Sequence, residues 1–345
     1  MAWIPHFGAA DRARYAREHN ARLGWGPAVD DQGRVLRLEP RFDPSYPARA
    51  GACASAYGDS FTGGAMAPDQ ETYPARLGQR LGCRVANYGV SAFGSDQALL
   101  LLRAQRHLDE APVVILGHVS ENILRNVNRY RNLLYPGDRL LFKPRFVLSA
   151  SGELRDLASP VRDVADLDAV RRAPEQTLRG DWLLMRPRRE FPYAWSLARW
   201  LAGDFHLRAY LSGRPRHASL YEPEHPSGAL ALTTAILAAF ADEAQATNRV
   251  PLVALIPVGA DLLYARRTGR WIDRPLAEAL RSRGVRTIHV GPDMLQRLGS
   301  RDPCTLFSEC HGHFNPEGYR LLAEIVFASL EGVRYPSGAV RATTQ

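Results

Sequence analysis

Short apolar runs alternate with longer amphipathic stretches from residue 51 onward, and this alternation constrains the fold more than any other feature. Strands are expected at 51–58, 84–90, 112–117, 251–258 and 285–291. Helices are expected at 71–82, 95–108, 228–247, 275–283 and 315–332. Nearly continuous apolar runs of this length are typical of parallel strands that helices cover on both faces. The sequence therefore predicts an open, mostly parallel α/β sheet.

Two segments interrupt the alternation and divide the chain into four parts. We expect an N-terminal extension over 1–50, an α/β core over 51–119 plus 226–335, an insertion over 120–225 and a tail over 336–345. Within the insertion, a β-hairpin is predicted at 140–157 with its turn at SASG, and a helix is predicted within 191–211. We expect the insertion to cap the carboxyl edge of the sheet, where ligands bind in open α/β folds.

The net charge of the chain could suggest nucleic acid or an acidic membrane as a partner, but the distribution of the basic residues argues against nucleic acid. The formal net charge is +8, and Lys143 is the only lysine among 44 Lys and Arg residues. The arginines are scattered along the sequence, and no nucleic-acid-binding motif accompanies them. We interpret the charge as an arginine-rich, solvated surface and expect no nucleic-acid partner.

The cysteines and the N-terminal sequence bear on the compartment. Cys53, Cys83, Cys304 and Cys310 are few for 345 residues, which predicts reduced thiols. The first twenty residues contain no apolar h-region, and no apolar run approaches the length that spans a bilayer. We therefore expect a cytoplasmic protein without a signal peptide or membrane insertion, and the sequence leaves its oligomeric state open.

The stretch YGDSFTGG at 57–64 places an acid, a hydroxyl and two glycines directly after the first predicted strand. Ser60 would then lie at the carboxyl edge of the sheet, with glycines that allow a sharp turn and the close approach of a ligand. A serine nucleophile needs a base within hydrogen-bond reach. His313 precedes the last predicted helix and belongs to the same edge, so we expect the two side chains to meet.

Four stretches carry a resemblance to a known family. GDSF at 58–61, NYGVSAFGSDQ at 87–97, GHVSEN at 117–122 and HFNPEGYRLLAE at 313–324 resemble the four sequence blocks of the SGNH, or GDSL, hydrolase superfamily. The resemblance covers about residues 51–119 and 228–335. It implies a three-layer α/β/α sandwich with a flavodoxin-like sheet, and serine-dependent chemistry on acyl esters.

The resemblance also implies roles for individual residues. Ser60 matches the nucleophile, His313 the base, and Asp59 a structural hydrogen-bond acceptor. The oxyanion hole would be formed by the N–H groups of Ser60 and of Ala92, with Gly94 close by, and by the side chain of Asn122. A shift of one position would place Glu121 there instead, where a carboxylate would oppose the developing negative charge.

The third member of the triad is the main departure from the family pattern. The family commonly has an aspartate three residues before the histidine, and Cys310 occupies that position. Either Glu309 orients His313, or a backbone carbonyl does so and the enzyme works as a Ser–His dyad. The competing interpretation of Cys304, Cys310, His311 and His313 as zinc ligands fits no finger or ribbon spacing. We expect neither a metal site nor a cofactor.

Lys143 and Arg145 alternate in the predicted hairpin and would share one face of a strand, directed toward an acidic substrate or toward solvent. They are the candidate substrate-binding residues.

The predicted function is hydrolysis of an acyl ester, such as an O-acetyl group, on a small molecule or carbohydrate. Two alternatives remain: an O-acyltransferase with the same Ser–His site, and a catalytically degenerate carbohydrate-binding protein. Geometry separates the last from the others, because a protein that only binds would not keep Ser60 within reach of His313.

Overall fold

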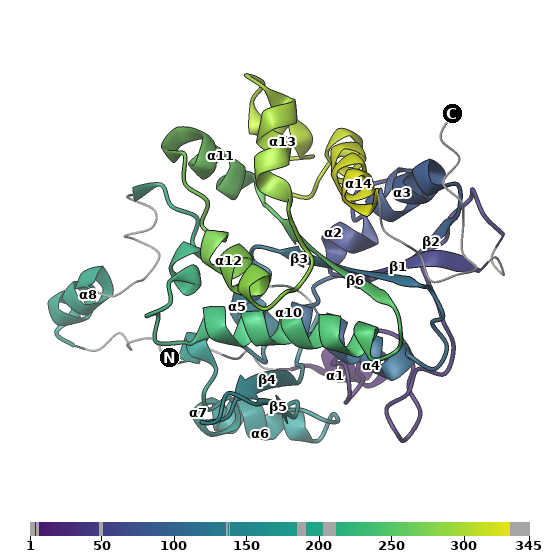
Figure 1. The fold of residues 1–345 in the computed structure, drawn as a ribbon. Helices are drawn as coiled ribbons and strands as arrows, with labels where there is room; N and C mark the ends of the chain where they lie inside the picture. The colour runs from purple at the N-terminus through teal and green to yellow at the C-terminus, as the bar shows by residue number, and fades with distance from the viewer. Residues whose placement is uncertain are drawn as a thin grey trace.

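A five-stranded parallel sheet forms the centre of the molecule (Figure 1). The computed structural model describes residues 4, 7–47, 51–135, 137, 139–184, 191–202 and 212–331. The strands are β1 (Ala52–Gly58), β2 (Arg84–Gly89), β3 (Val113–Val119), β6 (Val250–Ile256) and β7 (Thr287–His289). They lie in the order β2-β1-β3-β6-β7, which along the chain is the 2-1-3-4-5 order of flavodoxin-like sheets. The predicted α/β fold is confirmed.

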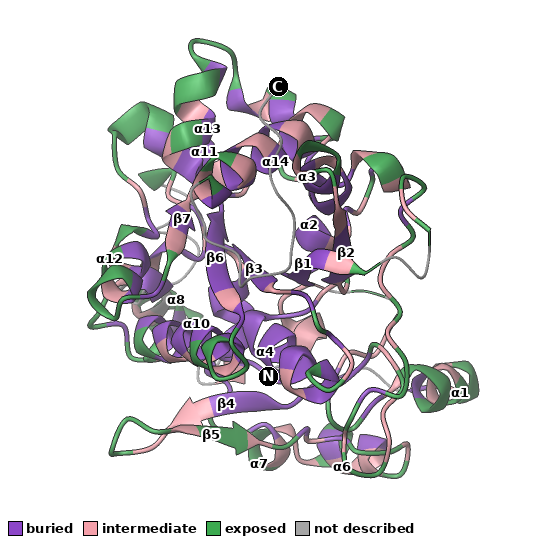
Figure 2. Ribbon diagram, turned by 45° about the vertical axis from the view of Figure 1, so that its right-hand side comes forward, coloured by how far each residue is buried: buried purple, intermediate pink, exposed green. Residues whose placement is uncertain are grey.

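Helices cover both faces of the sheet and give the molecule three layers (Figure 1). One face carries α4 (Ser95–Gln105), α10 (Ala229–Gln245) and α12 (Arg274–Ser282). The other carries α3 (Tyr73–Leu81), α13 (Val290–Leu298) and α14 (Pro316–Leu330). A separate cluster of buried apolar side chains packs on each face. All seven residues of the central strand β3 are buried, as its continuous apolar sequence predicts (Figure 2).

The insertion packs differently from the expectation. Its hairpin, β4 (Arg145–Leu148) and β5 (Leu154–Leu157), turns at 149–152 as predicted. The hairpin lies against α4 and α10, on the outer side of that helix layer (Figure 1). At the carboxyl edge of the sheet the insertion contributes residues 121–135 to the wall of a cavity. Among the described residues of the insertion, it is this first part, which includes α5 (Asn122–Asn126), that lines the cavity at the carboxyl edge.

The N-terminal extension and the insertion share a small core of their own. Helix α1 (Ala9–Glu18) lies in the N-terminal extension, where no helix was predicted, and Tyr15 is its one buried residue. With a single buried side chain, the helix shows no periodic pattern of apolar residues, so the sequence did not predict it. Tyr15 packs in a third apolar cluster with residues of the insertion such as Tyr130 and Phe142.

Further elements complete the described part of the chain. Helices α11 (Gly259–Thr268) and α13 were not expected, and helix α8 (Tyr193–Ala202) covers the first part of the helix expected within 191–211. The described residues of the insertion also form the helices α6 (Asp166–Arg172) and α7 (Pro174–Thr177) and three short 3-10 helices, Arg131–Leu133, Trp182–Leu184 and Ala218–Tyr221. Residues 203–211 and the expected tail, 336–345, lie outside the described residues.

All four cysteines are paired, so the prediction of reduced thiols is wrong. One disulfide joins Cys53 in β1 to Cys83 just before β2, and the other joins Cys304 to Cys310. Sulfur atoms that are bound to each other are not free to hold zinc. Because disulfides persist in oxidising compartments, the cysteines no longer support the prediction of a cytoplasmic protein. Within the described ranges, no helix combines the length and the apolar character needed to cross a membrane.

Candidate active site

The loop after β1 turns sharply and presents Ser60 as the first residue of the short helix α2 (Ser60–Gly63). Gly58 has φ 153°, and a Cβ there would meet the carbonyl oxygen of Gly117 at 2.8 Å. The turn therefore requires glycine at this position. Asp59 caps the helix, since its carboxylate accepts a hydrogen bond from the N–H of Phe61 at 2.9 Å. The Ser60 side chain is thereby fixed at the carboxyl edge of the sheet.

The loop before α14 holds His313 through hydrogen bonds on both sides of it. The carbonyl of His313 accepts a hydrogen bond from the N–H of Ser308 at 2.9 Å. Asn315 caps α14 by accepting from Gly318 N–H at 3.0 Å, and its amide donates to the carbonyl of Thr305 at 2.8 Å. The Cys304–Cys310 disulfide closes the same loop. His313 therefore projects from a cross-linked segment.

Ser60 and His313 meet as the sequence predicts. The distance from His313 Nε2 to Ser60 Oγ is 2.8 Å, although 253 positions separate the residues. The Phe61 ring lies beside the imidazole, with centroids 5.0 Å apart. Burial lowers the pKa of His313, and the charge on Asp59 partly opposes that shift. The imidazole is therefore neutral at neutral pH and able to accept the serine proton.

Glu309 does not orient His313. Its side chain is exposed, and it is the backbone carbonyl of Glu309 that is engaged, accepting from the N–H of Gly312 at 2.7 Å. The His313 ring forms no hydrogen bond or ion pair with any carboxylate or carbonyl of the described residues. Asp59 does not reach it either, because its second carboxylate oxygen pairs with Arg125 Nη1 at 2.8 Å. Within the described part of the chain, Ser60 and His313 therefore form a pair without a third member.

The candidate oxyanion donors differ in their availability. The N–H groups of Ser60 and Ala92 take part in none of the backbone hydrogen bonds of the described loops and caps. Ala92 has φ 68°, a conformation that glycine adopts more easily. Gly94 is not available, because its N–H already donates to Gln97 Oε1 at 3.0 Å at the start of α4.

Asn122 is buried, with 1% of its surface exposed, and its amide oxygen and nitrogen have no hydrogen-bond partner. Buried polar groups are rarely left unpaired unless they serve a ligand or a reaction. Its neighbour Glu121 lines the cavity next to Ser60, whereas Asn122 is not part of that lining.

A cavity of about 420 Å³ opens beside the Ser–His pair. Besides Ser60, Ala92 and His313, charged side chains from the start of the insertion line it, namely Glu121, Arg125 and Arg131. Sequence reasoning did not select the two arginines. The run of arginines in NILRNVNRYR was the available signal, but only the conformation of α5 and the following loop directs some of them to the site.

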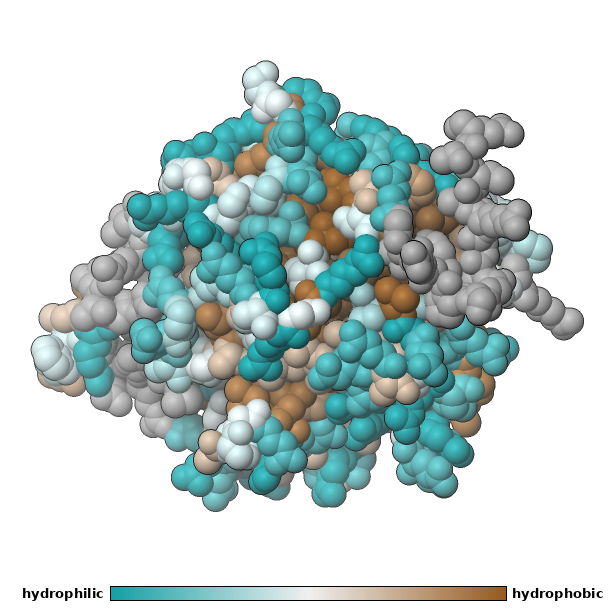
Figure 3. Space-filling model, viewed as in Figure 1, coloured by the Kyte–Doolittle hydropathy of each residue, from teal (hydrophilic) through white to brown (hydrophobic). Residues whose placement is uncertain are grey.

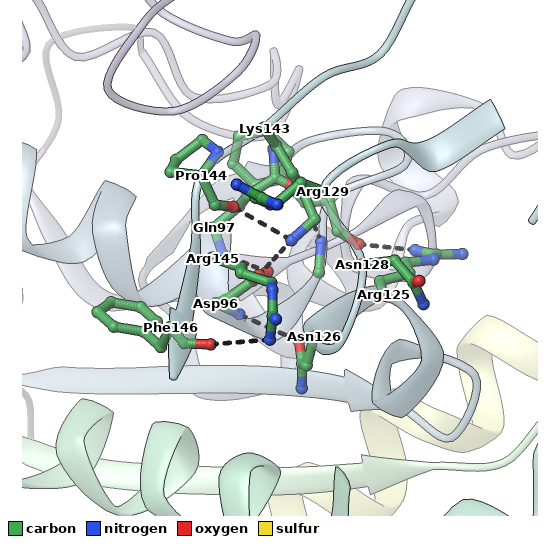
Figure 4. A network of polar contacts seen from close by, with 12 residues as sticks. Asp96, Gln97, Arg125, Asn126, Asn128, Arg129, Lys143, Pro144, Arg145 and Phe146 are labelled. Atoms are coloured by element: carbon green, nitrogen blue, oxygen red, sulfur yellow. Dashed lines mark hydrogen bonds and ion pairs between the residues drawn. The ribbon is translucent and has the colours of Figure 1, made fainter. Parts of the chain in front are cut away.

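Lys143 and Arg145, the candidate substrate-binding residues, are buried and lie outside the lining of the cavity beside Ser60. Lys143 is 1% exposed, and its ammonium pairs with the fully buried carboxylate of Asp96 (Figure 4). Arg145 is also buried, with Nε 3.2 Å from Asp181 and Nη2 bonded to the carbonyl of Gly180 at 2.7 Å. Neither side chain lines the cavity beside Ser60. Each side chain is instead held by a buried carboxylate, Asp96 for Lys143 and Asp181 for Arg145.

Proteins similar to this chain are found among solved structures. No family model and no curated protein matches the sequence. The chain is similar to a structure named as a lipolytic protein of the G-D-S-L family from Desulfitobacterium hafniense DCB-2, at 14% identity and a TM-score of 0.37, over 80% of this chain and 98% of that one.

Two further solved structures show the same likeness. A member of the lipolytic protein G-D-S-L family from Veillonella parvula DSM 2008 is 10% identical, with a TM-score of 0.39, over 81% of this chain and 98% of that one. A catalytic mutant of an acetylxylan esterase from Geobacillus stearothermophilus is 12% identical, with a TM-score of 0.38, over 84% and 98%. The solved structures that this chain is similar to thus include lipolytic proteins of the G-D-S-L family and an acetylxylan esterase.

Proposed function

We propose that the protein is a serine-dependent ester hydrolase, with Ser60 as nucleophile and His313 as general base. The observation that carries the proposal is the 2.8 Å contact between Ser60 Oγ and His313 Nε2 at the wall of a cavity. A protein that used this cavity only for binding a carbohydrate would have no need of the contact. The geometry therefore favours an enzyme over a degenerate binding protein.

The reaction would proceed through an acyl-enzyme. Ser60 Oγ attacks the ester carbonyl carbon while its proton passes to His313 Nε2. The N–H groups of Ser60 and Ala92 and the unpaired amide of Asn122 are the donors proposed for the oxyanion. The tetrahedral intermediate then breaks its bond to the alcohol oxygen, which takes the proton from His313. Water repeats the sequence on the acyl-enzyme and releases the acid.

No carboxylate of the described residues is hydrogen-bonded to the second nitrogen of the His313 imidazole, and this has a kinetic consequence. In a triad, that carboxylate holds the tautomer and stabilises the imidazolium, and changing it lowers kcat by roughly 10⁴. Here the loop cross-links and the charge on Asp59 would carry part of that work. We expect a slower enzyme than one with a full triad.

Transfer to an acceptor hydroxyl is the alternative fate of the same acyl-enzyme. Hydrolysis is proposed because water needs no second specific site. The cavity of about 420 Å³ has room for an acyl group such as acetyl together with part of the alcohol or acceptor.

Labelling with a serine-directed fluorophosphonate, read by intact mass, tests the nucleophile. We expect one adduct on the wild type, none on Ser60→Ala, and slower labelling of His313→Ala. Ser282→Ala is the matched control, because Ser282 is exposed at the end of α12 and should not alter labelling. Retained labelling of Ser60→Ala would show that another residue is the nucleophile.

Turnover of 4-nitrophenyl acetate then tests the reaction. Steady release of acetate without added alcohol would support a hydrolase. Release that depends on an added carbohydrate acceptor, with acetylation of that acceptor, would support the transferase instead.

A further inference from the structure

Two arginines of the cavity wall, Arg125 and Arg131, lie near a third, Arg216, which contacts the lining residues Tyr135 and Glu121, and we call these three arginines the arginine cluster. The guanidinium carbons of Arg131 and Arg216 each lie 4.1 Å from the centre of the Tyr135 ring. The Tyr135 hydroxyl donates to the carboxylate of Glu121. Arg125, Arg131, Tyr135 and Glu121 line the same cavity as Ser60 and His313. The cluster is thus built next to the reacting atoms.

Two members of the cluster have carboxylate partners and the third does not. Arg125 pairs with Asp59 at 2.8 Å, and Arg216 lies 3.5 Å from Glu121. Arg131 forms no ion pair with any described residue, and its Nε and Nη1 atoms are buried without a hydrogen-bond partner. The charges on Glu121 and Asp59 favour the protonated form of Arg131, but no carboxylate of the described residues pairs directly with its guanidinium.

Such a group is costly to keep in the free protein. Burying a cation without an anion is unfavourable, and unpaired N–H donors add to the penalty. Burial, and then the charge on Arg125, lowers the pKa of Arg131 to about 9, which leaves it protonated at neutral pH. Stacking on Tyr135 fixes the plane of the guanidinium. A planar fork held in this way matches two oxygens of an oxyanion.

We propose that the ester substrate carries an anionic oxyanion group, a carboxylate, sulfate or phosphate, which Arg131 binds beside the Ser60–His313 pair. The inference rests on the proposed hydrolysis only for the place of the ester bond, since the anion site itself is defined by Arg131. A neutral acetylated sugar would leave the Arg131 charge uncompensated, whereas an acidic sugar or another acidic ester would neutralise it. Glu121 does not form an ion pair with Arg131, because Tyr135 and Arg216 already engage its carboxylate.

Binding to the Ser60→Ala protein, measured by calorimetry, tests the proposal without requiring turnover. The probes are 4-acetoxybenzoate and its neutral partner 4-acetoxybenzamide, with 4-acetoxyphenyl sulfate and 4-acetoxyphenyl phosphate as the other anions. We expect at least one anion to bind tenfold or more tightly than the amide, since charge-assisted hydrogen bonds are of that strength. The strongest of the three identifies the oxyanion. Equal affinity for the amide and for all three anions would overturn the proposal.

Variants in the same background locate the site. Arg131→Gln should abolish the preference for the anion and leave the affinity for the amide unchanged, whereas Arg131→Lys should retain part of the preference. Arg274→Gln removes the same charge from an exposed position on α12 and should change nothing. A preference that survives Arg131→Gln would overturn the assignment. If Arg131→Gln does not fold, two results still test the proposal: the comparison of the anions with the amide in Ser60→Ala with Arg131 intact, and the preference that Arg131→Lys retains.

The two proposals fail separately. Anion-selective binding that depends on Arg131, without fluorophosphonate labelling or turnover of any ester, would contradict the hydrolase and leave the anion site standing. If acetate is released from 4-acetoxybenzamide and from the three anionic esters with equal kcat/KM, the anion site is contradicted and the hydrolase is left standing.

Discussion

At the residue scale, His313 sits between opposing influences that set the pH at which it can act. Burial disfavours the imidazolium and lowers the pKa of His313, Asp59 favours the imidazolium, and Arg125 disfavours it. The net pKa lies below the usual 6.5. Because a general base works only when unprotonated, activity should be present above this pKa and should fall as pH drops through it.

We therefore predict a kcat/KM profile with an acid limb centred below pH 6.5, measured with a neutral ester. In Asp59→Asn, the limb should move to still lower pH, because the charge that favours the imidazolium is gone. An acid limb above 6.5 in the wild type would mean that another group acts as the base.

Single residues also show what a sequence can and cannot disclose about a site. Ser60 and His313 were predictable, because each stands in a motif whose place at the carboxyl edge follows from the order of strands. Glu309 was not excluded by its position in sequence, and only the path of its loop directs its side chain to solvent. Arg131 was missed for the same reason, since its stacking on Tyr135 depends on a loop conformation that no local pattern encodes.

At the scale of elements, the strands and helices of the core follow local signals, whereas the disulfides depend on which elements the fold brings together. Cys53 and Cys83 meet because β1 and β2 pair in parallel register. That pairing lies at the amino edge of the sheet, away from Ser60. Cys304 and Cys310, by contrast, close the loop that carries His313, and the carbonyl of Cys310 packs against Gly259 at the start of α11.

The two disulfides should therefore have different effects when removed. In Cys304→Ser/Cys310→Ser, we predict a loss of about 2 kcal/mol in the free energy of unfolding, from the small closed loop, and a fall in kcat/KM of about 10²-fold, because His313 is less well positioned. Urea unfolding and steady-state kinetics measure the two effects.

The matched control is Cys53→Ser/Cys83→Ser. The closed loop spans a sequence separation of 30, so this variant should lose more stability, about 3–4 kcal/mol, while kcat/KM per folded molecule stays near the wild-type value. A larger kinetic loss in the control than in the first variant would refute the positioning role of the Cys304–Cys310 loop.

At the scale of the whole molecule, many of the arginines form ion pairs that are distributed over the fold. Pairs such as Arg12–Asp168, Arg80–Glu324 and Arg103–Glu243 join different elements. On the face seen in Figure 3, hydrophilic side chains cover most of the surface and apolar areas are small. These pairs are partly exposed, and ion pairs that solvent reaches contribute little to stability, about 0–1 kcal/mol each.

The buried charges have another role, because they join the insertion to the core. Lys143, the only lysine, precedes β4 in the insertion, and its partner Asp96 lies on α4 of the core. The sequence suggested instead that the Lys143 side chain faces an acidic substrate or solvent. The sequence could not reveal this pairing, because the two residues are 47 positions apart and neither stands in a motif for burial.

We predict that Lys143→Met destabilises the protein by about 3–5 kcal/mol, because it leaves the Asp96 carboxylate buried without its partner. Adding Asp96→Asn removes that charge and should restore most of the loss, since an uncharged buried pair of similar size is tolerated. Urea unfolding gives the stabilities, and kcat/KM per folded molecule should stay within about twofold in both variants. Unchanged stability together with a raised KM in Lys143→Met would instead show that Lys143 contacts the substrate. A double variant no more stable than the single one would show that Lys143 stabilises through packing of its aliphatic chain rather than through its charge.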